Sequence, residues 1–385
     1  MRIRRKRRNG AWIVALFSAL VLVLAACGGA DGAGGETATD GAAGAETEAA
    51  DEEAAAGPFT IGLSNGFIGS EWRTQMVEDV EQVFAEYEEQ GLVDQLIVES
   101  ADVDVNGQIQ QIRNLISAGV DAIIVNPNSA TALNVVFQEA EDQDIQVYAT
   151  DQAVEAEFVT NVVIDQEQWG AENAEWLAGE LGDRARIVAI NGIAGHPANE
   201  ARWSGAQAVF DDAGIEVLAN ANADWDEATA QQTMSDLLAT YQNLDGVFTQ
   251  DGMALGVFRA LEANNRIGEI TQTGEARAGF MQGWNELLES DTEFASVGVV
   301  NPPGIAGTAL RVAVNELQGN QIADDAFAED GHTLFAPIPG VVTNDNFDEF
   351  WPEVEGQPEA YVVDSIMTEE EVQEQFFSAT SADAS

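Results

Sequence analysis

The sequence predicts an α/β protein whose parallel sheets are covered by helices on both faces. From Pro58, short β-branched or apolar runs alternate with longer amphipathic stretches over about 260 residues. Strict alternation of this kind favours parallel sheets. Ten strand candidates and about 330 folded residues are more than one core usually holds, so we expect two sheets in two lobes.

Each strand and helix is expected from its own run of residues. The expected strands are 59–63, 96–99, 122–126, 146–150, 159–164, 185–190, 215–219, 246–249, 269–273 and 295–300. The expected helices are 71–87, 107–117, 130–141, 167–181, 200–212, 227–240, 254–263 and 305–317. The alternation fades beyond Gly319, but Thr368 and Glu371 have the spacing of a capping box and predict one more short helix.

The first 26 residues have the pattern of a lipoprotein signal peptide. Six basic side chains precede a run of 16 mostly apolar residues, which ends in Leu-Ala-Ala before Cys27. A helix of that length spans roughly 24 Å, short of a bilayer core of roughly 30 Å, so a retained transmembrane anchor is the weaker interpretation. Cys27 is the only cysteine, and its position favours lipidation over a catalytic thiol.

The remainder of the chain is strongly acidic. Residues 27–57 are rich in Gly, Ala and acidic residues and have no large apolar side chain, so we expect a disordered tether. Without residues 1–26 the chain keeps nine basic residues, all Arg, against 67 acidic ones, a net charge of −58. Because this remaining chain contains no Lys, it has neither a phosphate-loop lysine nor a Schiff-base lysine. Its strong negative charge excludes nucleic acid as a partner.

Polar and aromatic side chains gather directly after the strand candidates. Ligands of open α/β sheets bind beyond the carboxyl ends of the strands, so a site is expected in these loops. Carboxylates and amides that bind hydroxyls, guanidinium donors and indole faces together suit a polyhydroxylated small molecule. The candidate residues are Ser64, Asn65, Trp72, Arg73, Asp151, Arg202, Trp225, Asp251, Glu275 and Asn301.

Any one of these residues could instead have a structural role. A single Trp can be an ordinary packing residue, and an Asp after a strand can be a helix N-cap. Arginine carries more weight, because an Arg retained in so acidic a chain needs a partner. We therefore interpret Arg73 and Arg202 as ligand contacts or members of buried ion pairs.

An ordered series of segments resembles a known family. The segments are 59–64, 72–73, 122–129, 148–151, 191–195 leading to Arg202, 223–226, 247–251 and 253–256. Together they cover about residues 58–320. They resemble the type I periplasmic sugar-binding proteins that feed ABC transporters, the ribose- and galactofuranose-binding group.

The resemblance implies two Rossmann-like lobes joined by a hinge, which close on the ligand like a clamp. The N-terminal lobe would be 58–164 with about 301–340, and the C-terminal lobe 165–300 with part of 341–385. Connections are implied near Asp165, near 299–301 and near 338–341. The first lobe would contribute Ser64, Asn65, Trp72, Arg73 and Asp151 to the pocket, the second Arg202, Trp225, Asp251 and Glu275, and the crossover Asn301.

The resemblance also implies a function. The protein would capture a monosaccharide or related polyol and deliver it to an ABC permease and its ATPase, without catalysis, cofactor or metal. We expect a monomer on the outer face of the cytoplasmic membrane. There two acyl chains on Cys27 would suffice for stable attachment, where a single chain is marginal.

Two other functions stay open. A surface glycoside hydrolase needs two carboxyl groups, for which Asp224 and Asp226 are the candidates. A metal site or a serine triad has little support, because the chain has one Cys and two widely separated histidines, His196 and His332. A receptor for a nucleoside or signalling molecule that acts on a membrane sensor would keep the same fold, and the sequence does not separate import from sensing.

The acidic excess predicts stabilisation by salt and a saline habitat. Self-repulsion weakens as the Debye length falls from about 10 Å at 0.1 M salt to about 3 Å at 1 M. The midpoint temperature of unfolding should therefore rise between about 0.1 M and about 2 M NaCl. The midpoint temperature is measured by circular dichroism. A midpoint that does not change over that range of NaCl would contradict stabilisation by salt.

Overall fold

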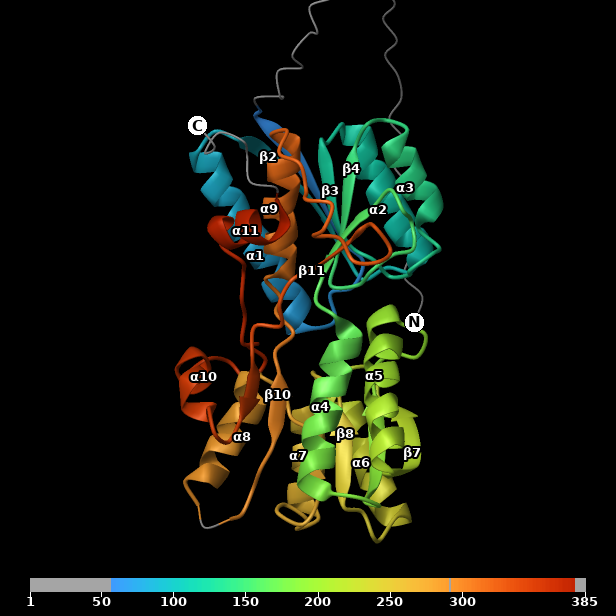
Figure 1. Cartoon of the computed structure of the whole chain (residues 1–385), viewed down its shortest axis with the longest axis vertical. Coiled ribbons are helices and arrows are strands. Elements are labelled where there is room, and N and C mark those ends of the chain that lie inside the picture. Colours follow the sequence, from blue (N-terminus) through green and yellow to red (C-terminus); the bar gives the residue numbers. More distant parts are fainter. Residues whose placement is uncertain (1–56, 291, 378–385) are drawn as a thin grey trace, which may run out of the picture. The chain divides into compact units, whose positions relative to one another are not determined.

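The computed structural model describes residues 57–290 and 292–377, which contain two parallel sheets (Figure 1). The first sheet has six strands in the order β11-β5-β4-β3-β1-β2, and the second has four in the order β7-β6-β8-β9. Neighbouring strands run parallel throughout both sheets. The α/β fold predicted from the sequence is confirmed.

The first sheet lies at the centre of one lobe. One core cluster packs α1, α9 and α11 on one face of the sheet, and a second packs α2 and α3 on the other. The strands are β1 (Phe59–Asn65), β2 (Val93–Ser100), β3 (Ala122–Asn126), β4 (Gln146–Thr150), β5 (Thr160–Val163) and β11 (Thr333–Phe335). The helices are α1 (Glu71–Glu89), α2 (Val105–Ala118), α3 (Asn134–Glu141), α9 (Ile305–Leu317) and α11 (Glu369–Phe376).

The second sheet organises the other lobe in the same way. Helices α4 and α5 pack on one face, and α6 and α7 pack on the other. The strands are β6 (Arg186–Asn191), β7 (Glu216–Asn222), β8 (Gly246–Thr249) and β9 (Thr271–Gln272). The helices are α4 (Gln166–Leu181), α5 (Pro197–Ala213), α6 (Glu227–Thr240), α7 (Ala254–Ala263) and α8 (Ala278–Leu288). An antiparallel pair, β10 (Val297–Val299) with β12 (Val341–Thr343), and α10 (Phe347–Val354) complete this lobe.

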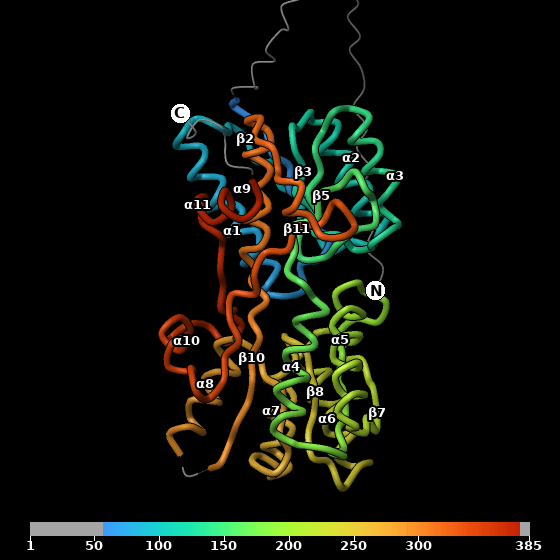
Figure 2. Tube along the Cα trace, in the orientation of Figure 1, coloured from blue at the N-terminus to red at the C-terminus, as the bar shows by residue number. Residues whose placement is uncertain are grey.

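The chain passes between the lobes at the three places that the resemblance implies. These are the steps from β5 to α4, from β10 to α9 and from β11 to β12. Within the described residues the chain passes a fourth time after α10, which packs beside α8, and then forms α11 beside α9 (Figure 2). We expected part of 341–385 in the C-terminal lobe and the rest as a tail. Strand β12 and helix α10 do lie in that lobe, whereas α11 packs in the first lobe.

Most expected elements are present, with local differences. Helix α3 begins at Asn134 rather than at residue 130, because the Ser129 hydroxyl accepts a hydrogen bond from the Ala132 amide (3.1 Å) and holds a turn there. The predicted capping box is confirmed at the start of α11, where the Thr368 and Glu371 side chains each bond the other's backbone amide. Helices α8 and α10 and strands β11 and β12 were not expected.

The predictions for the beginning of the chain lie outside the described residues. They are the signal peptide 1–26, the lipidation of Cys27 and the tether 27–57 except for its last residue. Within 57–290 and 292–377, no helix is both long and apolar enough to cross a bilayer.

Candidate ligand-binding site

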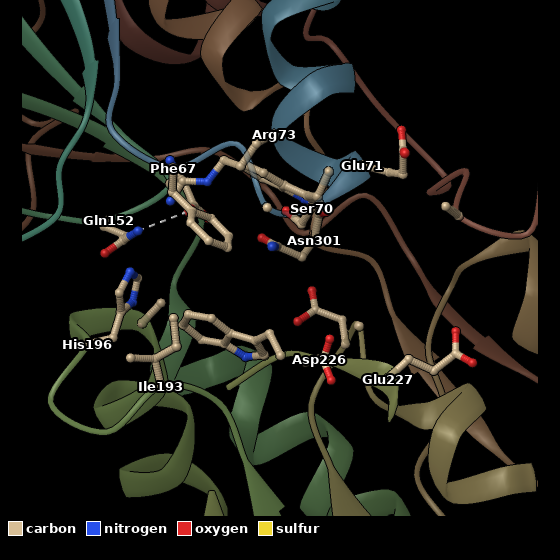
Figure 3. A pocket seen from close by; sticks show the side chains of 18 of the residues that line it. Phe67, Ser70, Glu71, Arg73, Gln152, Ile193, His196, Asp226, Glu227 and Asn301 are labelled. Atoms are coloured by element: carbon tan, nitrogen blue, oxygen red, sulfur yellow. Dashed lines mark hydrogen bonds between the residues drawn. The ribbon is translucent and has the colours of Figure 1, made fainter. Parts of the chain in front are cut away.

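A cavity of about 460 Å³ is lined by loops at the carboxyl ends of strands from both sheets (Figure 3). Its size falls within the range of small-molecule sites, about 300 to 1,000 Å³. Of the ten residues proposed from the sequence, eight line it: Trp72, Arg73, Asp151, Arg202, Trp225, Asp251, Glu275 and Asn301. Residues far apart in the sequence therefore meet at one site.

Ser64 and Asn65 do not line the cavity, which corrects our expectation for them. Both are buried at the end of β1. The Ser64 hydroxyl donates to Gln111 Oε1 (3.0 Å), and Asn65 Oδ1 accepts from Arg73 Nη1 (3.0 Å). These side chains are already engaged by neighbours within the first lobe, so Asn65 orients Arg73 instead of facing the cavity.

Arg202 is the most buried cation of the cavity wall, with 2% of its surface exposed. Its Nη1 lies 2.5 Å from Asp251 Oδ1, and its Nε donates to Gln166 Oε1 at 2.6 Å. The guanidinium also lies 4.1 Å from the ring centroid of Trp169. A buried arginine is tolerated where a carboxylate, an amide and an aromatic face share its charge in this way.

The close packing of α4 on α5 positions this arginine. A Cβ added at Gly170 of α4 would lie 1.9 Å from the backbone oxygen of Arg202, and one added at Gly205 of α5 would lie 2.0 Å from the backbone oxygen of Glu167. Only glycine permits the two helix backbones to approach this closely. The glycines thus fix where the Arg202 side chain enters the cavity.

Two further guanidinium groups lie beside carboxylates of the wall. Arg277 Nε lies 3.2 Å from Glu275 Oε2, and the Gly252 amide donates to the same oxygen. Burial, partly offset by the charge of Asp151, lowers the pKa of Arg73 to about 10. Burial raises the pKa of Glu275, and Arg277 opposes that shift. The wall therefore holds three guanidinium groups with the carboxyl groups of Asp151, Asp251 and Glu275 near them. It is also lined by the carboxyl residues Glu71, Asp226, Glu227 and Glu359.

Trp225 presents a face, and not its N–H group, to the cavity. The indole N–H donates to Gln250 Oε1 (2.9 Å), and a Cβ at Gly192 would lie 2.1 Å from the ring, so only glycine leaves room for it. Trp225 has φ 54° and its neighbour Asp224 has φ 55°, left-handed conformations that are strained for residues other than glycine. The indole N–H of Trp72 is likewise used within the protein, because it donates to the Asn301 backbone oxygen (2.8 Å).

His196 lies between the two lobes. Its ring is edge-on to Trp225, with centroids 4.7 Å apart. The Gln152 amide, from the first lobe, lies 3.0 Å from His196 Nε2 and 3.1 Å from Arg73 Nη2 (Figure 3). Burial, together with the charges of Arg73 and Arg202, lowers the pKa of His196 to about 3. The ring is therefore neutral at physiological pH.

Sequence reasoning missed several lining residues: Phe67, Gln152, His196, Arg277, Glu359 and Ala360. Arg277 had the signal that selected Arg73 and Arg202, since it too follows a strand in a chain that has few cations. Phe67, Gln152 and His196 stand in loops that the sequence did single out. Glu359 and Ala360 gave no signal, because they reach the cavity from the C-terminal segment.

The carboxylates proposed for a hydrolase do not have the character of a general acid and base. Asp226 Oδ1 caps α6 by accepting from the Thr229 amide (2.7 Å) and hydroxyl (2.7 Å), and these bonds lower its pKa. A glycosidase acid needs a raised pKa. Asp224 is exposed and does not line the cavity. Within the described ranges, no group of three or more His, Cys, Asp or Glu is arranged to hold a metal ion.

Two parallel-sheet lobes with a polar and aromatic cavity between their strand ends define a solute-binding protein. The sequence profile of the periplasmic binding protein domain family matches residues 61–321. The chain belongs to this family, whose members are solute-binding proteins and not enzymes. The resemblance stated from the sequence is thereby confirmed.

Relatives in the family are named for small carbohydrates and polyols. The chain is 30% identical to the ribose import binding protein RbsB of Bacillus subtilis over 210 residues, 54% of this chain and 67% of that protein. It is 30% identical to the xylitol-binding protein of Mycolicibacterium smegmatis over 262 residues, 66% of this chain and 70% of that protein.

A solved structure agrees with the fold. An ABC transporter solute-binding protein from Thermobispora bispora has a TM-score of 0.71 at 22% identity, over 82% of this chain and 94% of that one. A second, from Bacillus halodurans with bound myo-inositol, has a TM-score of 0.65 at 25% identity, over 78% of this chain and 99% of that one.

The environment of His196 predicts an unusual titration. The chain has two histidines, so selective ¹³C labelling gives two ring signals, and the His196→Gln variant identifies the one from His196. We expect that signal to titrate near pH 3 rather than near 6.5. Because the folded-state pKa lies below the usual value, this group stabilises the structure above about pH 6.5 and progressively less as the pH falls toward 3. A midpoint between about pH 6 and 7 would show that the ring is solvated in solution and contradict the structure.

Proposed function

We propose that this protein captures an uncharged monosaccharide or related polyol for import through an ABC permease and its ATPase. The observation that carries the proposal is the wall of three guanidinium and three carboxyl groups around the exposed face of Trp225. Such a wall offers many donors and acceptors to hydroxyls. The indole face covers the CH groups of a sugar ring.

Asn301 adds a specific acceptor to this wall. Its Oδ1 is buried and has no hydrogen-bond partner among the described residues, although the residue is only 7% exposed and lines the cavity. A buried acceptor without a donor is costly, and a ligand hydroxyl would satisfy it. Relatives named for ribose, xylitol and galactofuranose binding support the same class of ligand.

The ligand class is tested with a panel of pentoses, hexoses and cyclic polyols, followed by tryptophan fluorescence and isothermal titration. At least one should bind saturably. Trp225→Ala should weaken binding at least about thirtyfold, the equivalent of roughly 2 kcal/mol for a central aromatic contact. Trp351→Ala is the matched control, because Trp351 is also partly buried but lies outside the cavity.

Two results would count against this function. One is silence across the whole panel with unchanged thermal stability, because a ligand that binds only the folded state must raise the unfolding midpoint. The other is turnover of aryl glycosides that Asp226→Asn abolishes, which would support the hydrolase instead.

We also propose that Cys27 carries the lipid that holds the receptor at the outer face of the membrane. The apolar run followed by Leu-Ala-Ala-Cys supports this attachment. In cells, Cys27→Ser should move the protein from the membrane fraction to the soluble fraction. An unchanged distribution, or an unmodified Cys27 in the mass spectrum of the membrane-bound protein, would contradict the anchor.

A further inference from the structure

The fourth passage between the lobes is a segment that we call the C-terminal strap, residues 355–368. It leaves α10 in the second lobe and enters α11 in the first. The family profile ends at residue 321, so the strap lies outside the matched region. Two of its residues, Glu359 and Ala360, line the cavity.

Backbone hydrogen bonds fasten the strap to the second lobe at the start of α8. The Gly279 amide donates to Glu359 O and the Ala278 amide to Tyr361 O, both at 2.8 Å, and the Val363 amide donates to Ala276 O at 2.9 Å. Arg277 forms an antiparallel bridge with Val362 between these contacts. This part of the strap therefore moves with the second lobe.

Side chains of the first lobe hold the same stretch from the other side. Gln75 of α1 donates through Nε2 to Val362 O (3.1 Å) and accepts through Oε1 from the Val362 amide (3.2 Å). Two residues further on, Asp364 Oδ1 accepts from the Gly304 amide at the start of α9 (2.7 Å). Val362 is 5% exposed, so little water competes for these bonds.

The strap is attached to both lobes at the same residue, Val362. Val362 is bound at once by Arg277 of the second lobe and by Gln75 of the first. Beyond it, α11 is anchored by Val372 and Phe376 in the core of the first lobe, at 0% and 1% exposure. Separation of α1 from the start of α8 must therefore break the Gln75 bonds.

Two carboxyl groups, the buried Asp79 and the partly buried Asp364, also belong to this junction. Burial together with Asp364 and Glu78 raises the pKa of Asp79 in α1 to about 8, so Asp79 is protonated at neutral pH. Two negative charges would repel each other across the junction, whereas a protonated Asp79 can donate to the Asp364 carboxylate of the strap. Protonation of Asp79 thus removes a charge repulsion between α1 and the strap at neutral pH.

We propose that the C-terminal strap limits how far the two lobes separate, and that Gln75 is the positioning residue that holds it. The strap also keeps Glu359 and Ala360 at the cavity wall, where Arg259 Nη2 lies 3.1 Å from Glu359 Oε2 and Arg277 Nη1 donates to Ala360 O (3.4 Å). Limited separation keeps the unliganded protein close to its binding geometry. The apparent Kd rises in inverse proportion to the fraction of molecules in that geometry.

The test measures the distance between the lobes without any ligand. Spin labels are placed at Val135→Cys in α3 and Ala239→Cys in α6, both exposed, in the full chain with Cys27→Ser. Gln75→Ala should give a broader distance distribution that extends to longer distances. Gln75→Glu, which keeps the acceptor for the Val362 amide, should give an intermediate distribution.

Gln90→Ala is the matched control, because Gln90 directly follows α1 as its C-cap residue and its side-chain amide donates to the nearby Glu86 O (3.0 Å) instead of to the strap. It should leave the distribution unchanged. For a sugar that the wild type binds, Gln75→Ala should raise the Kd about threefold or more while Gln90→Ala does not. Identical distributions in the wild type, Gln75→Ala and Gln90→Ala would overturn the proposal. This readout is independent of sugar binding, so a failure of the proposed function would be distinguishable.

Discussion

Mutual neutralisation of buried charge is the constraint on which the cavity depends. An isolated charge as deep as that of Arg202 would cost several kcal/mol, and removal of one partner of such a pair is strongly destabilising. Asp251, Gln166 and the face of Trp169 share that charge. The paired charges place donors and acceptors on several sides of the cavity.

Backbone strain accompanies the charges at the strand ends. Asp151, Asp224 and Trp225 have positive φ, of 65°, 55° and 54°. Each such residue costs on the order of 1–3 kcal/mol and persists only where its surroundings over-determine it. The strained residues are held by their neighbours. The Gln166 amide donates to the Asp151 backbone oxygen (3.1 Å), and the Trp225 ring packs directly against Gly192. In both lobes the strain is located where side chains must turn from the sheet into the cavity.

The sequence predicted those parts whose signal is local. The apolar run 122–125, followed by Asn126, identifies a central strand, and the structure buries all five residues. Trp72 and Arg202 could be chosen because residue type and place after a strand coincide. Ser64 and Asn65 satisfied the same criterion, but their side chains are engaged within the first lobe, which pattern alone does not show. Strands β11 and β12 have three residues each, and their pairing partners lie far away in the sequence.

The strap shows why the C-terminal segment escaped prediction although the fold relies on it. Neither α8 nor α9 has a side-chain cap from its own N-cap residue, Arg277 or Gly304. The first amides of a helix need acceptors from elsewhere. For α8 these acceptors are the backbone oxygens of Glu359 and Tyr361. For α9 the acceptor is the side chain of Asp364. One extended segment thus completes a helix in each lobe. Because backbone groups provide most of these contacts, the side chains of the strap carry little trace of its role.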